Sequence, residues 1–186
     1  MAASNIQRLL KEKEGNLTNV IGRVVLLQDQ FCSAVYPWQQ LREESDGKIR
    51  LDIVPYPDID DTDGWTPAIL RRLESDSDND NSDNSDVIAV CLPPLHWSDG
   101  SFIDLEIIGQ VCRQKKIPLI VDATQGVGIM PLSVAKIQPT FLACSVHKVR
   151  PQKGKASPWE NFAFQFSAYE AFGILISTMF VFLRVF

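Results

Sequence analysis

The feature that most constrains the fold is a regular alternation of strand-like runs with segments of helical spacing. The strand-like runs, most of them continuously apolar, lie at 20–27, 49–54, 87–92, 117–121 and 141–144. The segments of helical spacing lie between them, at about 34–44, 66–73, 102–113 and 132–137. Buried strands that alternate with helices are typical of a parallel sheet covered on both sides. The sequence therefore predicts an α/β fold, with a mostly parallel sheet flanked by helices in a three-layer sandwich.

Composition divides the chain into three parts. Residues 1–22 are expected to form an N-terminal helical segment, 23–148 the sheet domain, and 149–186 a divergent tail. Within the sheet domain, residues 74–86 are almost entirely Asp, Ser and Asn. Such a stretch cannot bury enough apolar surface to become ordered. We therefore expect an acidic disordered loop at 74–86.

Length, charge and cysteines narrow the class of protein. With 186 residues, 45% of them apolar, the chain can bury one substantial core. Its net charge of -5 disfavours nucleic acid as a partner. The four cysteines are widely spaced without C-x-x-C pairing, which favours buried free thiols in a reducing compartment over a zinc site or disulfides. Because residues 1–15 also lack the apolar core of a signal peptide, we expect a cytoplasmic protein.

The apolar end of the tail leaves an alternative open. Residues 172–186 are almost wholly apolar except for Arg184. The run before that arginine is short of the roughly 20 residues that cross a bilayer as a helix. A misfit tail is therefore favoured over a C-terminal membrane anchor.

Two polar residues follow two of the apolar runs. Asp122 comes directly after 117–121, and Lys148 follows 141–144 with His147 beside it. Ligands of parallel sheets collect at the carboxyl ends of the strands, so both residues are expected at one crevice. A half-buried carboxylate needs a cation, and a lysine in a partly apolar cleft can lose its proton and form an imine. This pair suits pyridoxal phosphate. Taken singly, the aspartate could instead be a turn residue and the lysine a surface residue.

Four motifs together resemble one enzyme family. The stretch from about 23 to 148 resembles the large domain of class V aminotransferases, fold-type I pyridoxal-phosphate enzymes that include kynureninases, cysteine desulfurases and isopenicillin-epimerase-like proteins. The motifs occur in the family's order along the chain: Asp29-Gln30-Phe31-Cys32-Ser33 with Tyr36-Pro37-Trp38, His96-Trp97-Ser98-Asp99-Gly100, Asp122-Ala123-Thr124-Gln125-Gly126-Val127-Gly128, and Ser145-Val146-His147-Lys148.

The resemblance implies a role for each matching residue. Lys148 would be the Schiff-base amine and proton shuttle, and Asp122 would bind the pyridine nitrogen. The remaining contacts that it implies are Gln125 to the ring hydroxyl, Thr124 to a ring face, and Ser145 and His147 to the phosphate. His96 and Trp97 lie in the loop that approaches the ring and substrate, although simple packing explains a His-Trp pair after two prolines equally well.

The resemblance implies a pyridoxal-phosphate enzyme acting on an amino acid by transamination, elimination or hydrolytic cleavage. Two of the family's elements have no counterpart here: a phosphate-capping loop before Gln28, and a substrate-binding arginine in the part that follows Lys148. We therefore expect a partial large domain in a truncated chain with impaired activity. An inactive fragment or isoform, or an interaction protein, is the alternative. The family's homodimer is doubtful for such a chain.

Overall fold

A computed structural model describes residues 20–57, 64–74, 86–127, 129–145, 174–177 and 180–184. The expected helical segment at 1–22 and the acidic loop at 74–86 lie almost wholly outside these residues. The strands are β1 (Gly22–Leu27), β2 (Ile49–Val54), β3 (Val87–Leu92), β4 (Leu119–Asp122), β5 (Phe141–Ser145), β6 (Ile174–Ser177) and β7 (Phe180–Arg184). The helices are α2 (Cys32–Glu44), α3 (Trp65–Glu74), α4 (Leu105–Gln114) and α5 (Val134–Ile137), with a short 3-10 turn, η2 (Ala123–Gln125).

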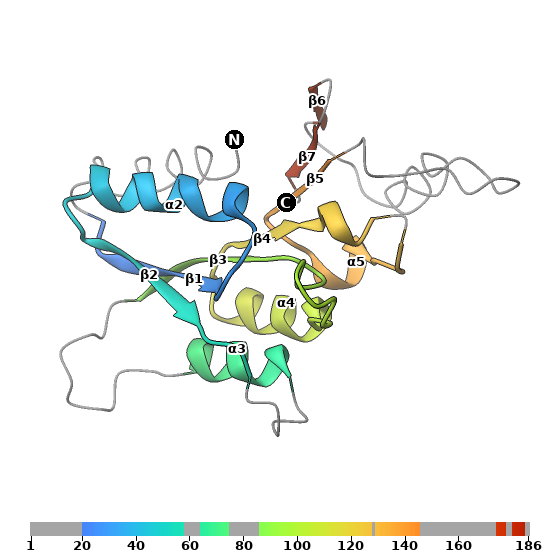
Figure 1. The fold of residues 1–186 in the computed structure, drawn as a ribbon, viewed down its shortest axis with the longest axis horizontal. Helices are drawn as coiled ribbons and strands as arrows, with labels where there is room; N and C mark the ends of the chain where they lie inside the picture. Colours follow the sequence, from blue (N-terminus) through green and yellow to red (C-terminus); the bar gives the residue numbers. More distant parts are fainter. Residues whose placement is uncertain are drawn as a thin grey trace, which may run out of the picture.

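The strands form one sheet in the order β2-β1-β3-β4-β5-β7-β6. Strands β1 to β5 pair with one another in parallel, whereas β7 runs antiparallel to both β5 and β6. Figure 1 shows the resulting twist from β2 to β5. The mostly parallel sheet that the sequence predicts is therefore confirmed.

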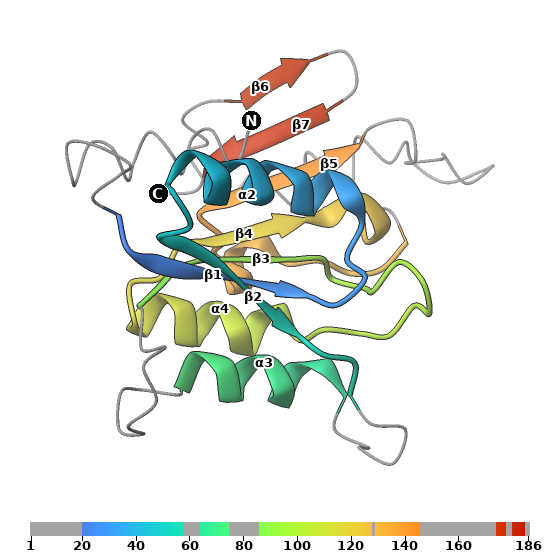
Figure 2. The same cartoon turned by 60° about the vertical axis from the view of Figure 1, so that its left-hand side comes forward.

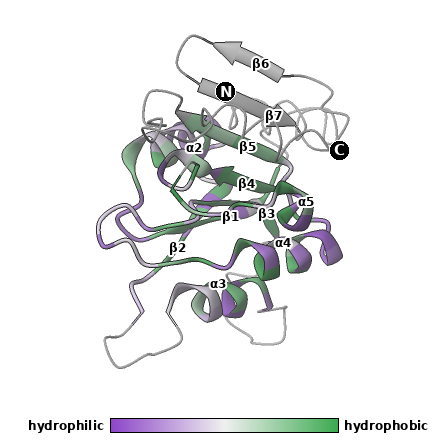
Figure 3. Cartoon of the chain, turned by 90° about the vertical axis from the view of Figure 1, so that its right-hand side faces the viewer, coloured by the Kyte–Doolittle hydropathy of each residue, from purple (hydrophilic) through white to green (hydrophobic). Residues whose placement is uncertain are grey.

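Helices cover both faces of this sheet, with α2 on one face and α3 and α4 on the other (Figure 2). The alternation of side chains along β1 explains the two layers. Val24 and Leu26 belong to the core beneath α2, together with Trp38. Val25 and Leu27 belong to the opposite core, which α3, α4 and α5 complete. The apolar residues accordingly gather on the central strands between the helices (Figure 3). This three-layer sandwich matches the prediction.

The helices begin one to three residues away from the expected positions, and for α4 a side-chain cap explains the difference. Helix α4 begins at Leu105, later than the expected 102, since the Asp104 carboxylate accepts hydrogen bonds from the amides of Glu106 and Ile107 at 3.0 and 3.2 Å. Helix α3 begins at Trp65, which places Thr66 inside its first turn. The Thr66 hydroxyl accepts a hydrogen bond from the Asp104 amide at 2.9 Å, and so links the two helices.

The tail contributes strands to the described structure. Strand β7 pairs with β5 in the register Phe141 to Arg184, and β6 pairs with β7. Among the described residues, no helix has the length and apolar character needed to cross a membrane. Within the apolar run at 172–186, the described residues 174–177 and 180–184 therefore form strands.

The cysteines lead to a first prediction. All four are free thiols; Cys91, Cys112 and Cys144 are buried and Cys32 is exposed. Burial raises the pKa of both Cys91 and Cys112 to about 12. Because the thiolate is the reactive form, roughly one in ten thousand of these buried thiols is ionised at pH 8. Iodoacetamide at pH 8 is expected to label only Cys32 in the native protein and all four cysteines in urea, as measured by peptide mass spectrometry. Native labelling of Cys91 at the rate of Cys32 would contradict this arrangement.

Candidate functional site

The candidate site is the carboxyl edge of the sheet, defined here as residues 28–31, 55–57, 93–101, 122–127 and 145. Because β1 to β5 are parallel, the segments that follow them all emerge at this edge. The predicted residues His96, Trp97, Asp122, Thr124 and Gln125 lie there, and Ser145 ends β5. His147 and Lys148 lie outside the described residues.

Asp122 is the last residue of β4 and is half-buried. Its Oδ1 accepts a hydrogen bond from the Thr124 amide at 3.1 Å, which caps η2. Among the described residues, Oδ2 has no hydrogen-bond donor or cation partner. Burial, and to a lesser degree the charge of Asp122, raises the pKa of Cys91 on neighbouring β3 to about 12. A half-buried carboxylate, with one oxygen that accepts no hydrogen bond from the described residues, suits a cationic N–H donor.

The turn after Asp122 is held close to the loop that follows β3. Thr124 and Gln125 are half-buried on η2, and Gly126 follows them. A Cβ added at Gly126 would lie 2.5 Å from Cγ of Pro94. Glycine therefore permits the close approach that brings Thr124 and Gln125 to the carboxyl edge.

The strand pair that the sequence predicts to carry Asp122 and Lys148 is present. Strands β4 and β5 are parallel neighbours, with Asp122 in register with Ala143. Ser145 lies two residues further along β5, and Lys148 follows three residues later in the sequence. The described structure thus confirms the neighbouring strands, while the position of the Lys148 amine stays a prediction.

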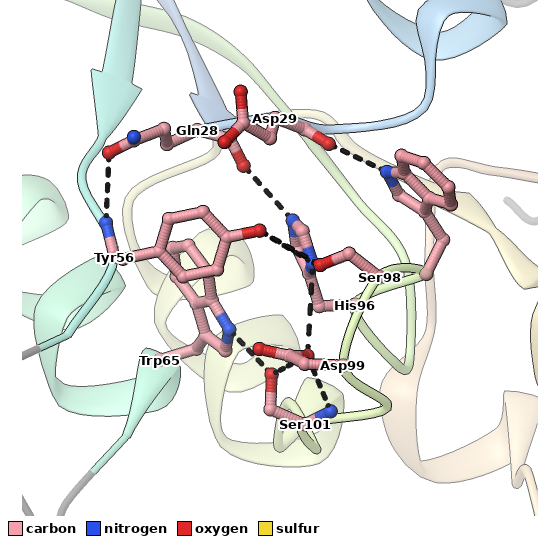
Figure 4. Close-up of polar contacts among 9 residues, drawn as sticks. Gln28, Asp29, Tyr56, Trp65, His96, Ser98, Asp99 and Ser101 are labelled. Carbon is pink, nitrogen blue, oxygen red and sulfur yellow. Dashed lines mark hydrogen bonds and ion pairs between the residues drawn. The ribbon is translucent and has the colours of Figure 1, made fainter. Parts of the chain in front are cut away.

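His96 is fully buried, with 0% of its surface exposed. Its ring is stacked on Trp65 at 5.1 Å and meets the Tyr56 ring edge-on at the same centroid distance. Its Nε2 lies 3.0 Å from the Gln28 carbonyl oxygen, and its Nδ1 lies 2.9 Å from the Ser98 hydroxyl (Figure 4). A ligand could therefore touch His96 only if these neighbours moved, so its predicted contact with a cofactor stays untested.

Trp97 is half-exposed beside the turn between β1 and α2. Its indole N–H donates to the Asp29 carbonyl oxygen at 2.6 Å. Its ring meets Phe31 in a T-shaped contact with centroids 5.9 Å apart, and both rings are partly open to solvent, at 51% and 42% exposed. The carboxyl edge therefore presents two aromatic side chains where the sequence predicts only Trp97 as a contact.

Sequence reasoning did not anticipate the polar cluster below His96. The amide and the hydroxyl of Ser101 both donate to Oδ1 of Asp99, at 2.9 and 2.6 Å, and they lower the pKa of Asp99. The Trp65 indole N–H donates to the same hydroxyl at 2.8 Å. The only sequence signal was the turn-like composition of residues 98–101.

Within the described ranges, no group of three or more His, Cys, Asp or Glu side chains could hold a metal ion.

Comparison with curated proteins points to cysteine desulfurases. The chain is 35% identical to cysteine desulfurase IscS of Pasteurella multocida (strain Pm70) over 74 residues, which is 40% of this chain and 18% of that protein. It is 39% identical to cysteine desulfurase IscS of Proteus mirabilis (strain HI4320) over 64 residues, 34% of this chain and 16% of the relative. The matches thus span less than a fifth of these relatives.

Solved structures show the same fold. An apo structure of a cysteine desulfurase from Thermococcus onnurineus NA1 has a TM-score of 0.54 at 17% identity, with 79% of this chain and 39% of that chain covered. A crystal structure of a SepCysS-SepCysE N-terminal domain complex has a TM-score of 0.53 at 17% identity, with 89% and 36% covered. At this identity the likeness concerns the fold alone.

Comparison with protein-family models identifies the family of the chain. The model for aminotransferase class-V matches residues 18–154, which include every strand of the parallel sheet and every predicted site residue. This match covers most of the chain, and the half-buried aspartate at the end of β4 lies within it. The chain belongs to the class V aminotransferase family.

Proposed function

We propose that this protein binds pyridoxal 5'-phosphate at the carboxyl edge and acts on an amino acid. The observation that carries the proposal is the Asp122 carboxylate, which is half-buried and has Oδ2 without a donor among the described residues. A protonated pyridine nitrogen is the kind of charged donor that this oxygen lacks. Family membership supports the same cofactor.

Each predicted residue except the buried His96 has a proposed task toward the cofactor or substrate. Asp122 would keep the ring nitrogen protonated, and Lys148 would attach the cofactor covalently and move a proton at the substrate's α-carbon. The other proposed contacts are Gln125 and Thr124 to the ring, Ser145 and His147 to the phosphate, and Trp97 near the substrate. When bound, the cofactor ring withdraws the electron pair left at that carbon.

Cysteine is the first substrate to test. The curated relatives and one of the solved structures are named cysteine desulfurases. Those proteins are matched over 16–18% and 39% of their lengths, so their activity enters here as a proposal. Alanine formed from cysteine, with sulfide released only when an added thiol such as dithiothreitol reduces the persulfide, is expected for desulfuration. Elimination would instead give pyruvate and sulfide, and transamination would give a keto acid only in the presence of an amino-group acceptor.

The proposed cofactor site predicts the effect of Asp122→Asn. The amide oxygen of asparagine still accepts from the Thr124 amide, so the unfolding free energy should change by less than about 0.5 kcal/mol. Loss of the charge-assisted contact should raise the dissociation constant for pyridoxal 5'-phosphate about tenfold. Titration of the full chain with the cofactor, followed by visible absorption, measures this constant.

Asp46→Asn is the matched control for this experiment. Asp46 is exposed in the turn before β2, at the amino edge of the sheet, and its φ of 54° is one that asparagine tolerates. This variant should bind the cofactor like the parent chain. A parent chain that retains no cofactor absorption once unbound pyridoxal 5'-phosphate is removed would refute the proposed function and favour the interaction-protein alternative.

A further inference from the structure

The surroundings of His96 determine which ring nitrogen carries its proton. Nε2 lies 3.0 Å from the backbone carbonyl oxygen of Gln28. A carbonyl oxygen can only accept a hydrogen bond, so Nε2 must be the donor. The contact therefore requires a proton on Nε2.

The other ring nitrogen has a hydroxyl partner that suits the neutral ring. Nδ1 lies 2.9 Å from the Ser98 hydroxyl, which in turn lies 2.9 Å from the Tyr56 hydroxyl. With Nδ1 unprotonated, Ser98 donates to Nδ1 and accepts from Tyr56, so every hydroxyl hydrogen has an acceptor. The Tyr56 and Trp65 rings pack against the imidazole and leave it no exposed surface. The Asp99 carboxylate also faces Nδ1, but its Oδ1 lies 3.8 Å away and already accepts two hydrogen bonds from Ser101. The hydrogen-bond geometry thus favours a neutral imidazole with its proton on Nε2.

His96 and Trp97 together hold two successive carbonyl groups of the turn between β1 and α2. His96 donates to the carbonyl of Gln28, and the Trp97 indole donates to that of Asp29 at 2.6 Å. Asp29 has a φ of 51°, in the left-handed region that aspartate adopts less readily than glycine. Hydrogen bonds to both carbonyls stabilise this conformation, so the loop after β3 determines the shape of the turn.

The turn is also tied to the strands on either side of it. The buried Gln30 side chain accepts from the Leu27 amide at 2.9 Å and donates to the Cys91 carbonyl at 3.1 Å. Phe31, the next residue, precedes α2 and has its ring against Trp97. A change in the turn would therefore move an aromatic side chain of the carboxyl edge.

We infer that His96, as the neutral Nε2-protonated tautomer, and Trp97 are positioning residues that fix the turn at 28–31, and with it Phe31. The importance of this turn for catalysis rests on the proposed function, whereas its geometry does not. The inference assigns His96 an action through the turn, without any contact between its ring and the cofactor.

The first test uses the full chain without added cofactor. The chain has two histidines, so a His147→Asn variant identifies the ring signals of His96 in ¹⁵N NMR spectra. We expect a protonated Nε2 and an unprotonated Nδ1. A ring protonated on Nδ1, or on both nitrogens, at pH 7.5 would overturn the inference.

The second test compares two replacements of His96 by amide hydrogen exchange. The amide nitrogen of His96→Gln reaches the place of Nε2 and can still donate to Gln28, whereas the shorter side chain of His96→Asn reaches only the place of Nδ1. Losing this hydrogen bond should speed exchange of the Gln30 and Leu27 amides about tenfold in the asparagine variant. The glutamine variant should stay within about twofold of the parent. Equal exchange in the two variants would refute the positioning role.

Trp97→Phe keeps the test decisive if His96→Asn fails to fold. Phenylalanine preserves an aromatic ring beside Phe31 and removes only the donor to the Asp29 carbonyl. Exchange of the Gln30 amide should again become about tenfold faster. Unchanged exchange would show that Trp97 does not hold the turn.

Titration with pyridoxal 5'-phosphate separates this inference from the proposed function. His96→Asn should bind the cofactor more weakly with an unchanged absorption maximum, because no group touching the ring is replaced. A shifted maximum in both His96 variants would show direct contact and overturn the inference. If the parent chain binds no cofactor but shows the expected tautomer and exchange rates, the proposed function fails and the positioning role stands.

Discussion

Lys148→Ala is expected to abolish covalent attachment of pyridoxal 5'-phosphate. Lys148 is the third residue after β5, whose neighbour β4 ends at Asp122. An amine that emerges beside the carboxylate can attach the cofactor while Asp122 holds the ring nitrogen. Borohydride reduction, followed by peptide mass spectrometry, should find the cofactor on the peptide containing Lys148 in the parent chain. The variant should carry none, and its visible absorption band should disappear.

Lys136→Ala provides the matched control. The Lys136 side chain on α5 is 68% exposed, and its Nζ lies 3.4 Å from a carboxylate oxygen of Glu106. Exposed ion pairs of this kind contribute little to stability, so the variant should fold like the parent and keep the full cofactor band. Reductive labelling that persists in Lys148→Ala at the parent level would identify another lysine and refute the role proposed for Lys148.

Gly109→Ala is expected to destabilise the protein by about 2 to 3 kcal/mol through overpacking. Gly109 lies on α4 where that helix crosses the end of α5. An added Cβ would lie 2.2 Å from the carbonyl oxygen of Ile137 and 3.1 Å from its carbonyl carbon. This oxygen also accepts a hydrogen bond from Arg113 at 2.6 Å, so backbone and side chain would have to move together. The midpoint of urea unfolding, monitored by circular dichroism, measures the loss.

Helix propensity alone predicts the opposite change in the unfolding free energy, so the measurement distinguishes it from overpacking. In an exposed helix, replacing glycine by alanine stabilises by about 1 kcal/mol. Gln110→Ala, at the exposed neighbouring position of α4, should change the unfolding free energy by less than about 0.5 kcal/mol. An unfolding midpoint for Gly109→Ala at or above that of the parent would show that α4 and α5 do not pack as described.

The strands could be predicted well because a strand that is buried on both faces has a nearly continuous run of apolar side chains. The predicted limits of β2 and β3 agree with those in the structure, β1 and β5 differ at one end by two residues and one residue, and β4 differs at both ends. Helix α4 was predicted to start too early because Phe102 continues its apolar pattern. Phe102 instead pairs with Leu95 in an isolated bridge, and the Asp104 cap starts the helix. Such caps depend on a single carboxylate, which periodicity does not detect.

The residues of the candidate site likewise differ in how far the sequence alone predicts their positions. Asp122, Thr124 and Gln125 could be placed from the sequence, because a polar segment directly after a buried strand must emerge at the carboxyl edge. The role of His96 could not be placed. Its partners Gln28, Tyr56 and Ser98 follow three different strands, and only the order β2-β1-β3 brings them around one ring.

The sequence by itself determined the α/β class, the polar segments at the strand ends and the family, because local burial patterns and short motifs carry that information. Only the tertiary structure decided that one oxygen of Asp122 lacks a donor among the described residues, and that His96 is buried against the turn at 28–31. The physical reason is that these features depend on pairing between segments far apart in the chain. Strand neighbours, buried polar contacts and close approaches at glycine are set by how layers pack, which no single segment encodes.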